Sequence, residues 1–362
     1  MDDKNLLVEE TSKPEKKKSG LKKKLLTVLF VIINIAIIAY TAFVEFSGGR
    51  PTGIEIEFNW VSVLFLLGAI LCLAMAYFCE TVKYITIMKS LDEKVSVKHA
   101  FEVAAFGKYY DSLTPSGAGG QPFQIWYLKS KGYSTGSSAA MPIAGFLSMQ
   151  LGFVVLAIFV FIFNSSAIEI TTIKIAAYFG LLMYLIVPLV ILFFAFSPKA
   201  ATKLLMVFIN LFSKLKFIKN PQQKGEKILN TLNDYRDKIF IIIKRKSLIL
   251  NLLMISILYQ MALCSIPYFV LSAFGGDLGF IKVLSMCVFI YAAITFIPTP
   301  GNSGVAEGSF YLLFSGLETG GLFWSMLIWR LFTYYAFISI GALMYFYNAF
   351  IRGRVRKYFG QE

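Results

Sequence analysis

The chain has 362 residues, of which 57% are hydrophobic and 15% are charged. Soluble domains carry about 25% charged residues, so this composition excludes a soluble globular protein. The net charge of +14 does not indicate a nucleic-acid partner, because the basic residues flank apolar runs. In that position they set membrane orientation and attract anionic lipid. We therefore expect no direct contact with nucleic acid.

Apolar runs long enough to cross about 30 Å of hydrocarbon recur along the chain. They follow residues 1–24, a lysine-rich segment that we expect to be a disordered cytoplasmic tail. We predict a transmembrane domain over residues 25–350 and a second cytoplasmic tail over 351–362. Within the domain, the basic stretch 198–246 is typical of amphipathic helices on the cytoplasmic face. Full spans are expected at about 25–44, 60–85, 137–163, 176–196, 248–274 and 320–348.

The loops between these spans alternate between basic and nearly uncharged or acidic. Lysine and arginine concentrate on the cytoplasmic side of membrane proteins, so this alternation puts both termini in the cytoplasm. We expect a multi-pass protein of the bacterial cytoplasmic (inner) membrane.

Two apolar segments do not fit this series of spans. Residues 99–128 are interrupted by TPSGAGGQ at Thr114–Gln121, and residues 280–316 by PTPGNSGVAE at Pro298–Glu307. The arms are too short to cross and return, so we predict re-entrant helical hairpins, the first entering from the cytoplasm and the second from outside. Matching breaks of opposite orientation indicate inverted repeats with a binding site at their interface. The alternative is that both breaks are ordinary turns rich in glycine and proline.

The breaks have the chemistry of an anion site. Irregular backbone at membrane depth is tolerated only where protein buries it or where it lines a cavity. Each second arm begins with free N–H groups and a positive dipole end, which suit a phosphate. Tight helix packing is the alternative use of the glycines. The expected headgroup-binding residues are Thr114, Pro115, Ser116, Gly117, Gly119, Gly120, Gln121, Pro300, Gly301, Asn302, Ser303, Gly304, Glu307 and Arg330.

Arg330 lies about ten residues into the last span, which puts it about 15 Å deep. A charge at that depth requires a partner. Glu307 is the leading candidate and a headgroup phosphate is the other, and competition between them would make a gate. The alternative is a static structural ion pair.

Other charged residues near the breaks are secondary candidates. Lys108 and Asp111 flank the first break and would hold headgroup charges, or would anchor the chain at the interface. Glu80 and Lys83 are three residues apart on one helical face, which is typical of a local pair that snorkels toward water. We find no nucleotide-binding motif, no nucleophile motif and no metal-ligand spacing. We therefore expect no catalytic residues, no metal and no cofactor.

Three features together resemble a known family across nearly all of residues 20–350. They are LTPSGAGGQPFQIWYL at the first break, PTPGNSGVAE at the second, and the arginine of the last span. The chain resembles the flippase-like transmembrane domain of the lysyl-phosphatidylglycerol synthase (phosphatidylglycerol lysyltransferase) family. The first break departs from the family pattern, because Gln121 stands where the family has glutamate and no arginine follows.

The resemblance implies a lipid-translocating domain, joined in full-length members to a cytosolic domain that transfers lysine from tRNA to phosphatidylglycerol. Their product lowers surface negative charge and confers resistance to cationic peptides. This chain ends at Glu362, so we expect the flipping part without the transferase and no enzyme activity of its own.

We therefore predict an all-α polytopic membrane protein with about six full spans plus two re-entrant helical hairpins in inverted repeats. The expected function is flipping of an anionic or aminoacylated phospholipid, such as lysyl-phosphatidylglycerol, or of a polyprenyl-phosphate lipid. Expected partners are that lipid and a separate lipid-modifying enzyme, and oligomerisation is left open. The alternatives are the membrane part of a lysyltransferase system, a secondary transporter of a small anion, and a scaffold for a partner enzyme.

Overall fold

The apolar runs of the sequence fold into long helices. The computed structural model describes residues 59–115, 117, 119–197, 200, 203, 234–295, 297–315 and 321–347. All of these residues belong to one structural unit, Pro51–Glu362. The long helices are α2 (Trp60–Ser90), α5 (Thr135–Phe163), α6 (Thr171–Phe196), α9 (Lys246–Ala273), and a last span made of α12 (Leu322–Arg330), a π-helical segment η2 (Leu331–Tyr335) and α13 (Ala336–Phe346).

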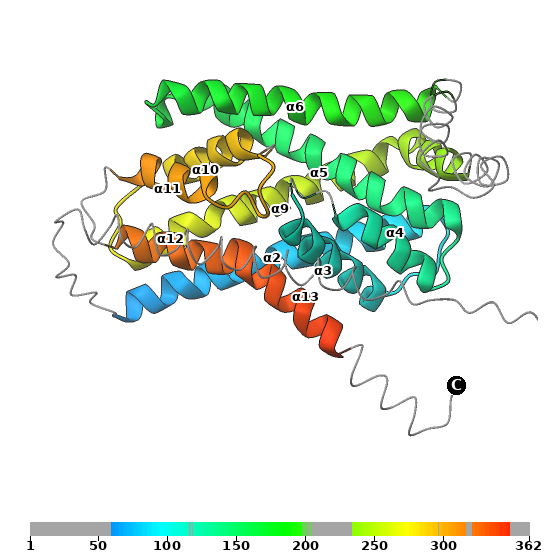
Figure 1. Cartoon of the computed structure of the whole chain (residues 1–362), viewed down its shortest axis with the longest axis horizontal. Coiled ribbons are helices and arrows are strands. Elements are labelled where there is room, and N and C mark those ends of the chain that lie inside the picture. The colour runs from blue at the N-terminus through cyan, green and yellow to red at the C-terminus, as the bar shows by residue number, and fades with distance from the viewer. Residues whose placement is uncertain are drawn as a thin grey trace, which may run out of the picture. The chain divides into compact units, whose positions relative to one another are not determined.

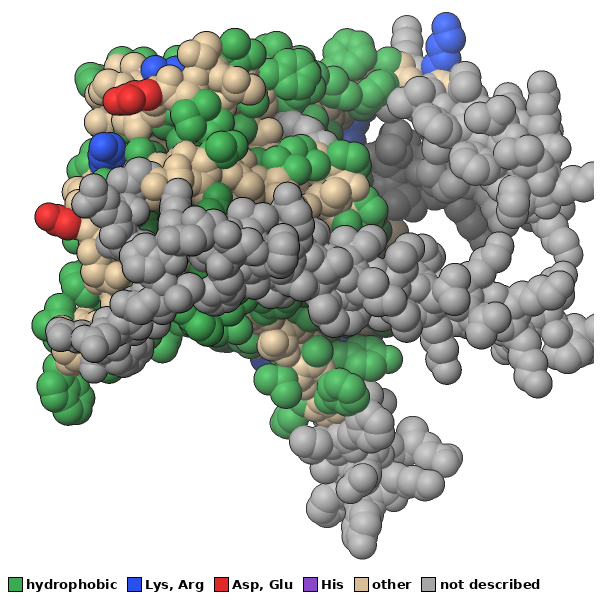
Figure 2. Space-filling view, turned by 60° about the vertical axis from the view of Figure 1, so that its left-hand side comes forward, with side chains coloured by type: hydrophobic (Ala, Val, Ile, Leu, Met, Phe, Trp, Pro, Cys, Tyr) green, Lys and Arg blue, Asp and Glu red, His purple; other side chains and the backbone are tan. Residues whose placement is uncertain are grey.

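These five helices are long and apolar enough to cross a membrane. Large apolar side chains stay exposed along them, and the face in Figure 2 is mainly hydrophobic over the described residues. Such a surface is stable only against lipid. The described part of the chain is therefore an all-helical, polytopic integral membrane protein, as predicted.

Several helix starts follow from local chemistry. Asn59 caps α2 and Ser134 caps α5, because each side chain accepts a hydrogen bond from a backbone N–H in the first turn. α2 continues to Ser90 and α6 begins at Thr171, so both are longer than the runs 60–85 and 176–196. The predicted spans end where the hydropathy of the sequence falls, whereas each of these two helices continues into the more polar residues beyond.

Two pairs of shorter helices interrupt the series at the predicted places. α3 (Val97–Leu113) and α4 (Gly120–Ser130) flank the first break, and α10 (Phe280–Ile294) and α11 (Val305–Phe314) flank the second. In Figure 1 the two pairs lie at opposite ends of the helix bundle, with their breaks directed toward the centre.

Contacts between helices repeat in the two halves of the chain. α2 packs on α3 and on α5, and in the same way α9 packs on α10 and on α12. The hairpin of each half also packs against the other half, since α3 contacts α13 and α10 contacts α5. α2 and α9 pack along each other between the halves. This correspondence is the pattern that two inverted repeats produce.

Several predicted parts lie outside the described residues. They are the first span at 25–44, the tails at 1–24 and 351–362, and most of the basic stretch 198–246. Of that stretch, residues 234–244 form a helical segment.

Candidate functional site

The two breaks meet each other. Pro115 and Pro300 form an isolated antiparallel bridge between two otherwise helical segments. Each proline follows a threonine, Thr114 or Thr299, so the bridge pairs equivalent positions of the two motifs. An antiparallel contact between equivalent residues is the local geometry that a two-fold axis imposes.

The agreement extends to two further positions of each break. The N-cap glycine of the return helix is Gly119 in the first break and Gly304 in the second, in both cases five positions after the threonine. Three positions after each threonine the backbone is left-handed, with φ of 63° at Gly117 and 54° at Asn302. Since glycine and asparagine tolerate this conformation best, the turn chemistry is shared although the residues differ.

The start of α4 is already capped by side chains. The Asp111 carboxylate accepts a hydrogen bond from Gly120 N–H at 2.9 Å, and the Thr114 hydroxyl accepts one from Gly119 N–H at 2.8 Å. The expectation of free N–H groups at this break is therefore wrong for these two amides. A phosphate would have to displace the aspartate to reach them.

In the second break too, a carboxylate caps the start of the return helix. Glu307 lies in the first turn of α11, and its Oε2 accepts a hydrogen bond from Gly304 N–H at 2.6 Å. The Ser303 hydroxyl donates to the Pro300 carbonyl at 2.9 Å, which closes the turn. A carboxylate of the protein thus occupies each helix start that the sequence assigned to a ligand, since the dipole favours any anion there.

Arg330 and Glu307 form the predicted ion pair. Arg330 Nε donates to Glu307 Oε1 at 2.6 Å, and Nη1 donates to the carbonyl of Gly301 at 3.1 Å. Arg330 is 6% exposed, yet its Nη2 has no hydrogen-bond partner among the described residues. The guanidinium also lies 5.3 Å from the ring centres of Trp329 and Tyr334. Within the described part of the chain, both N–H groups of Nη2 are therefore unoccupied.

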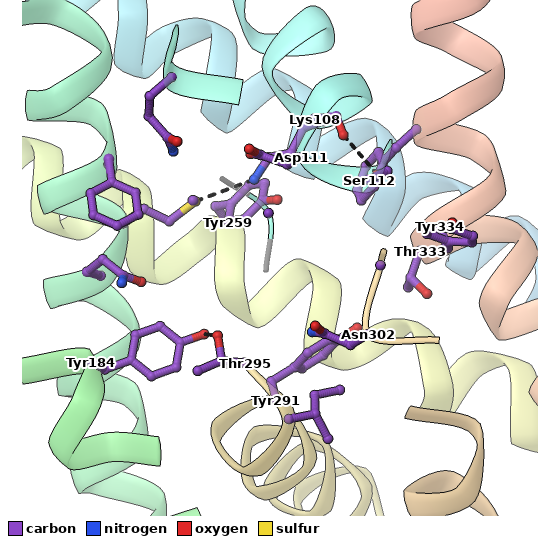
Figure 3. A pocket seen from close by; sticks show the side chains of 18 of the residues that line it. Lys108, Asp111, Ser112, Tyr184, Tyr259, Tyr291, Thr295, Asn302, Thr333 and Tyr334 are labelled. Carbon is purple, nitrogen blue, oxygen red and sulfur yellow. Dashed lines mark hydrogen bonds between the residues drawn. The ribbon is translucent and has the colours of Figure 1, made fainter. Parts of the chain in front are cut away.

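A cavity of about 640 Å³ joins the two halves. Figure 3 shows Lys108, Asp111 and Tyr259 grouped on one side of it and Asn302 and Tyr291 on another. The predicted site residues that line it are Lys108, Asp111, Gly117, Gln121, Gly301, Asn302 and Arg330. Those that shape the turns behind it are Thr114, Pro115, Gly119, Gly120, Pro300, Ser303, Gly304 and Glu307; Ser116 lies outside the described residues.

A second charge cluster lies behind the first break. Lys83 Nζ lies 2.7 Å from Glu80 Oε1, and Lys108 Nζ lies 4.0 Å from the same oxygen. Lys83 and Glu80 are 2% and 4% exposed, so the interpretation of a snorkelling pair is wrong. Lys108 also lies 4.6 Å from the ring centre of Tyr259. The pair is buried because α3 covers this face of α2 and adds a second cation.

Sequence reasoning missed the polar residues that the long helices contribute. Tyr184 of α6 and Thr295 at the end of α10 are hydrogen-bonded at 2.7 Å on the cavity wall, and Gln150 of α5 and Tyr259 of α9 also line it. Tyr334 lines it as well. Single polar residues within apolar spans were the available signal. Among the described residues, no three His, Cys, Asp or Glu side chains are grouped to hold a metal.

Comparison with known proteins agrees with this architecture. The chain is 27% identical over 300 residues to a UPF0104 membrane protein of Archaeoglobus fulgidus, covering 80% of this chain and 87% of that one. UPF0104 membrane proteins of Pyrococcus horikoshii and Methanothermobacter thermautotrophicus are each 22% identical, over 79% of this chain and 84% of theirs. The family described as "Lysylphosphatidylglycerol synthase TM region" matches residues 25–341. The chain belongs to this lysylphosphatidylglycerol synthase transmembrane-region family.

Proposed function

We propose that this protein moves the headgroup of an anionic or aminoacylated lipid between the two leaflets of the cytoplasmic membrane. Candidate lipids are a phospholipid such as lysyl-phosphatidylglycerol and a polyprenyl-phosphate lipid. The observation that carries the proposal is Arg330, a buried guanidinium at the shared cavity whose Nη2 nitrogen has no partner among the described residues. Guanidinium groups bind phosphate through several N–H donors, so a phosphate ester fits this position.

The geometry supports a competitive mechanism. In the empty site Glu307 neutralises Arg330 and caps α11 through its two oxygens. A phosphate that enters the cavity binds Nη2 first and then draws the guanidinium away from Glu307. The freed carboxylate remains at the helix start, where the dipole stabilises it. Release of the phosphate restores the ion pair, so Glu307 acts as the gate.

Both breaks take part because they line the same cavity. Lys108 and Gln121 face it from the first half, and Asn302 and Arg330 from the second. We propose that the hairpins are re-entrant, the first from the cytoplasm and the second from outside, with both termini cytoplasmic. Each half then opens the cavity to one side of the membrane in turn.

Purified protein in liposomes tests this function. A fluorescent phosphatidylglycerol is placed in the membrane, and the fraction that a membrane-impermeant quencher reaches is followed over time. We expect wild-type protein to accelerate exchange and Arg330→Gln to abolish it. Arg330→Lys should retain only a small part of the rate, because an ammonium lacks the planar set of N–H donors that binds a phosphate through several bonds. Lys282→Gln removes an exposed cation at the start of α10 and should leave the rate unchanged.

Two results would contradict the proposal. One is that wild-type protein moves no fluorescent, aminoacylated or polyprenyl-phosphate lipid. The other is saturable uptake of a soluble phosphate or carboxylate without lipid movement, which would favour a small-anion transporter.

A further inference from the structure

Among the described residues, the positive and negative charges at and next to the cavity are equal in number. Lys108, Asp111 and Arg330 line the cavity. Behind them, Glu80 and Lys83 form an ion pair next to Lys108, and Glu307 pairs with Arg330. The set therefore holds three cations, Lys83, Lys108 and Arg330, against three carboxylates, Glu80, Asp111 and Glu307.

This balance has a consequence for an anionic lipid. A phosphate that enters brings one negative charge into a site whose own charges cancel. An uncompensated charge at membrane depth is costly, so either a cation enters with it or a carboxylate takes up a proton. No described group of carboxylates is arranged to hold a metal ion, so the proton is the simpler counter-charge.

The carboxylates differ in how firmly they are held as anions. In the empty site Glu307 accepts from Arg330 and from Gly304 N–H, each at 2.6 Å, and after Arg330 turns to the phosphate it keeps the Gly304 N–H at the positive end of α11. Glu80 is buried and lies 2.7 Å from Lys83. Asp111 makes no ion pair within the described residues, and its carboxylate has the single backbone bond from Gly120. Of the three carboxylates, Asp111 is the one that lines the large cavity.

Charged and polar groups surround Asp111 from the helices that pack around it. Lys108 lies on its own helix, and a small cavity lined by Asp111 is also lined by Glu80, Lys83 and Tyr84 of α2. α9 contributes Tyr259, α4 contributes the Gly120 N–H, and α5 carries no charged residue. A proton on Asp111 leaves both lysines and Glu80 in place and adds one positive charge to the set.

We propose that the protein is a proton–lipid symporter, in which Asp111 binds one proton for each anionic headgroup that crosses. This inference rests on the proposed lipid translocation. On the side where the headgroup enters, the Asp111 carboxylate accepts a proton from water. The headgroup and proton cross together with no net charge, and both are released on the other side.

The test imposes a pH difference of about one unit across liposomes that contain the full-length protein, with the voltage held at zero by a potassium ionophore. The probes are phosphatidylglycerol and phosphatidylcholine with the same fluorescent acyl chain. Symport makes the anionic lipid accumulate about tenfold in the leaflet that faces the alkaline side, since the product of lipid and proton concentrations must equalise. The zwitterionic lipid should stay evenly distributed.

Variants assign the effect to Asp111. Asp111→Asn keeps an oxygen to accept from Gly120, and it should move phosphatidylglycerol in response to voltage but not to the pH difference. Asp111→Glu should retain the response to pH, as should Glu169→Gln, which removes an exposed acid between α5 and α6. A pH response that persists in Asp111→Asn would overturn the role of this residue.

The two proposals fail differently. If wild-type phosphatidylglycerol equilibrates at the same rate and to an even distribution with and without the pH difference, the proton coupling is wrong and translocation stands. If no lipid moves under any condition, translocation is wrong and the coupling falls with it. The wild-type measurement alone decides the coupling where a variant does not fold.

Discussion

The Arg330 side chain connects the ion pair of the second break to the cavity. Its guanidinium holds Glu307 with Nε and the Gly301 carbonyl with Nη1, and it presents Nη2 without a partner among the described residues. Burying such a donor without a partner costs free energy. The arrangement is stable because the ion pair and two aromatic rings surround the rest of the cation. The unpartnered Nη2 therefore supports the proposed phosphate site.

Removing one member of the ion pair should cost more stability than removing both. In Glu307→Gln the buried guanidinium loses its counter-charge, and we expect a loss of about 3 kcal/mol in unfolding free energy. The double variant Glu307→Gln/Arg330→Gln should be more stable than the single variant, because no buried charge remains. Denaturant unfolding in detergent micelles measures both. Asp277→Asn, at an exposed acid, is the control and should change stability by less than about 0.5 kcal/mol. A double variant that simply adds the two single losses would show that the pair is not coupled.

The glycines of the breaks should differ in their tolerance of alanine. Gly301 and Gly117 both have positive φ, of 58° and 63°, which costs an alanine about 1 kcal/mol. At Gly301 the added methyl group would also collide with the Tyr334 ring, whereas at Gly117 the nearest heavy atom is 3.8 Å away. We expect Gly301→Ala to lower the thermal midpoint clearly more than Gly117→Ala. Asn302→Gly, at φ 54°, should lose no stability. Equal losses at the two glycines would mean that Tyr334 moves aside freely.

At the level of helices, the sequence predicted the interruptions because proline and glycine leave a local signal. Pro115 and Pro300 cannot continue a helix, and the glycines that follow supply the turn. The Arg330–Glu307 pair was also predictable, since a deep charge needs a partner. Both inferences depend on residues close together in sequence or on a single strong energetic requirement.

The rest of the site depends on tertiary structure. Asp111 caps α4 only because the first break folds back, and Lys108 joins Glu80 only because α3 packs on α2. Tyr184 and Tyr259 are single polar residues in apolar helices, and the sequence does not show which face they occupy. The π-helical turn after Arg330 has no local signal such as proline. These features come from packing between distant elements.

The contact between the two breaks can be tested by cross-linking. In a chain whose four cysteines are replaced, Pro115→Cys and Pro300→Cys should form a disulfide, because bridged residues have Cα atoms about 4.5–5.5 Å apart. Pro115→Cys with Lys282→Cys is the control and should not cross-link, since Lys282 lies at the far end of α10. If the breaks separate during transport, the disulfide should also stop lipid exchange until it is reduced. Absence of the disulfide under mild oxidation would contradict the bridge.

The whole molecule is organised by the correspondence between its two halves. Among the described residues, each half contains a span, a broken-helix hairpin and a second span, and several contacts of one half reappear in the other. The contact of α6 with α10 has no counterpart in that part of the chain. The single bridge between equivalent prolines lies where the halves meet. Similar turn geometry in the two halves is what the proposed alternating-access mechanism requires. Among the described residues that line the cavity, the arginine comes from the second half, so the two halves of the proposed site are not chemically equivalent.

This architecture requires the two hairpins to enter from opposite sides, which residue accessibility decides. Single cysteines at Asp92 and Lys131 flank the first hairpin, and those at Ser165 and Asp277 lie at the opposite ends of α5 and α9. In intact cells, a membrane-impermeant thiol reagent should label Ser165→Cys and Asp277→Cys. Asp92→Cys and Lys131→Cys should react only after the membrane is opened, because lysines concentrate on the cytoplasmic side. The cysteine-free chain is the background, and labelling in permeabilised cells confirms that each position is reactive. If Asp92→Cys and Asp277→Cys reacted from the same side, the hairpins would be parallel and the inverted-repeat arrangement would be wrong.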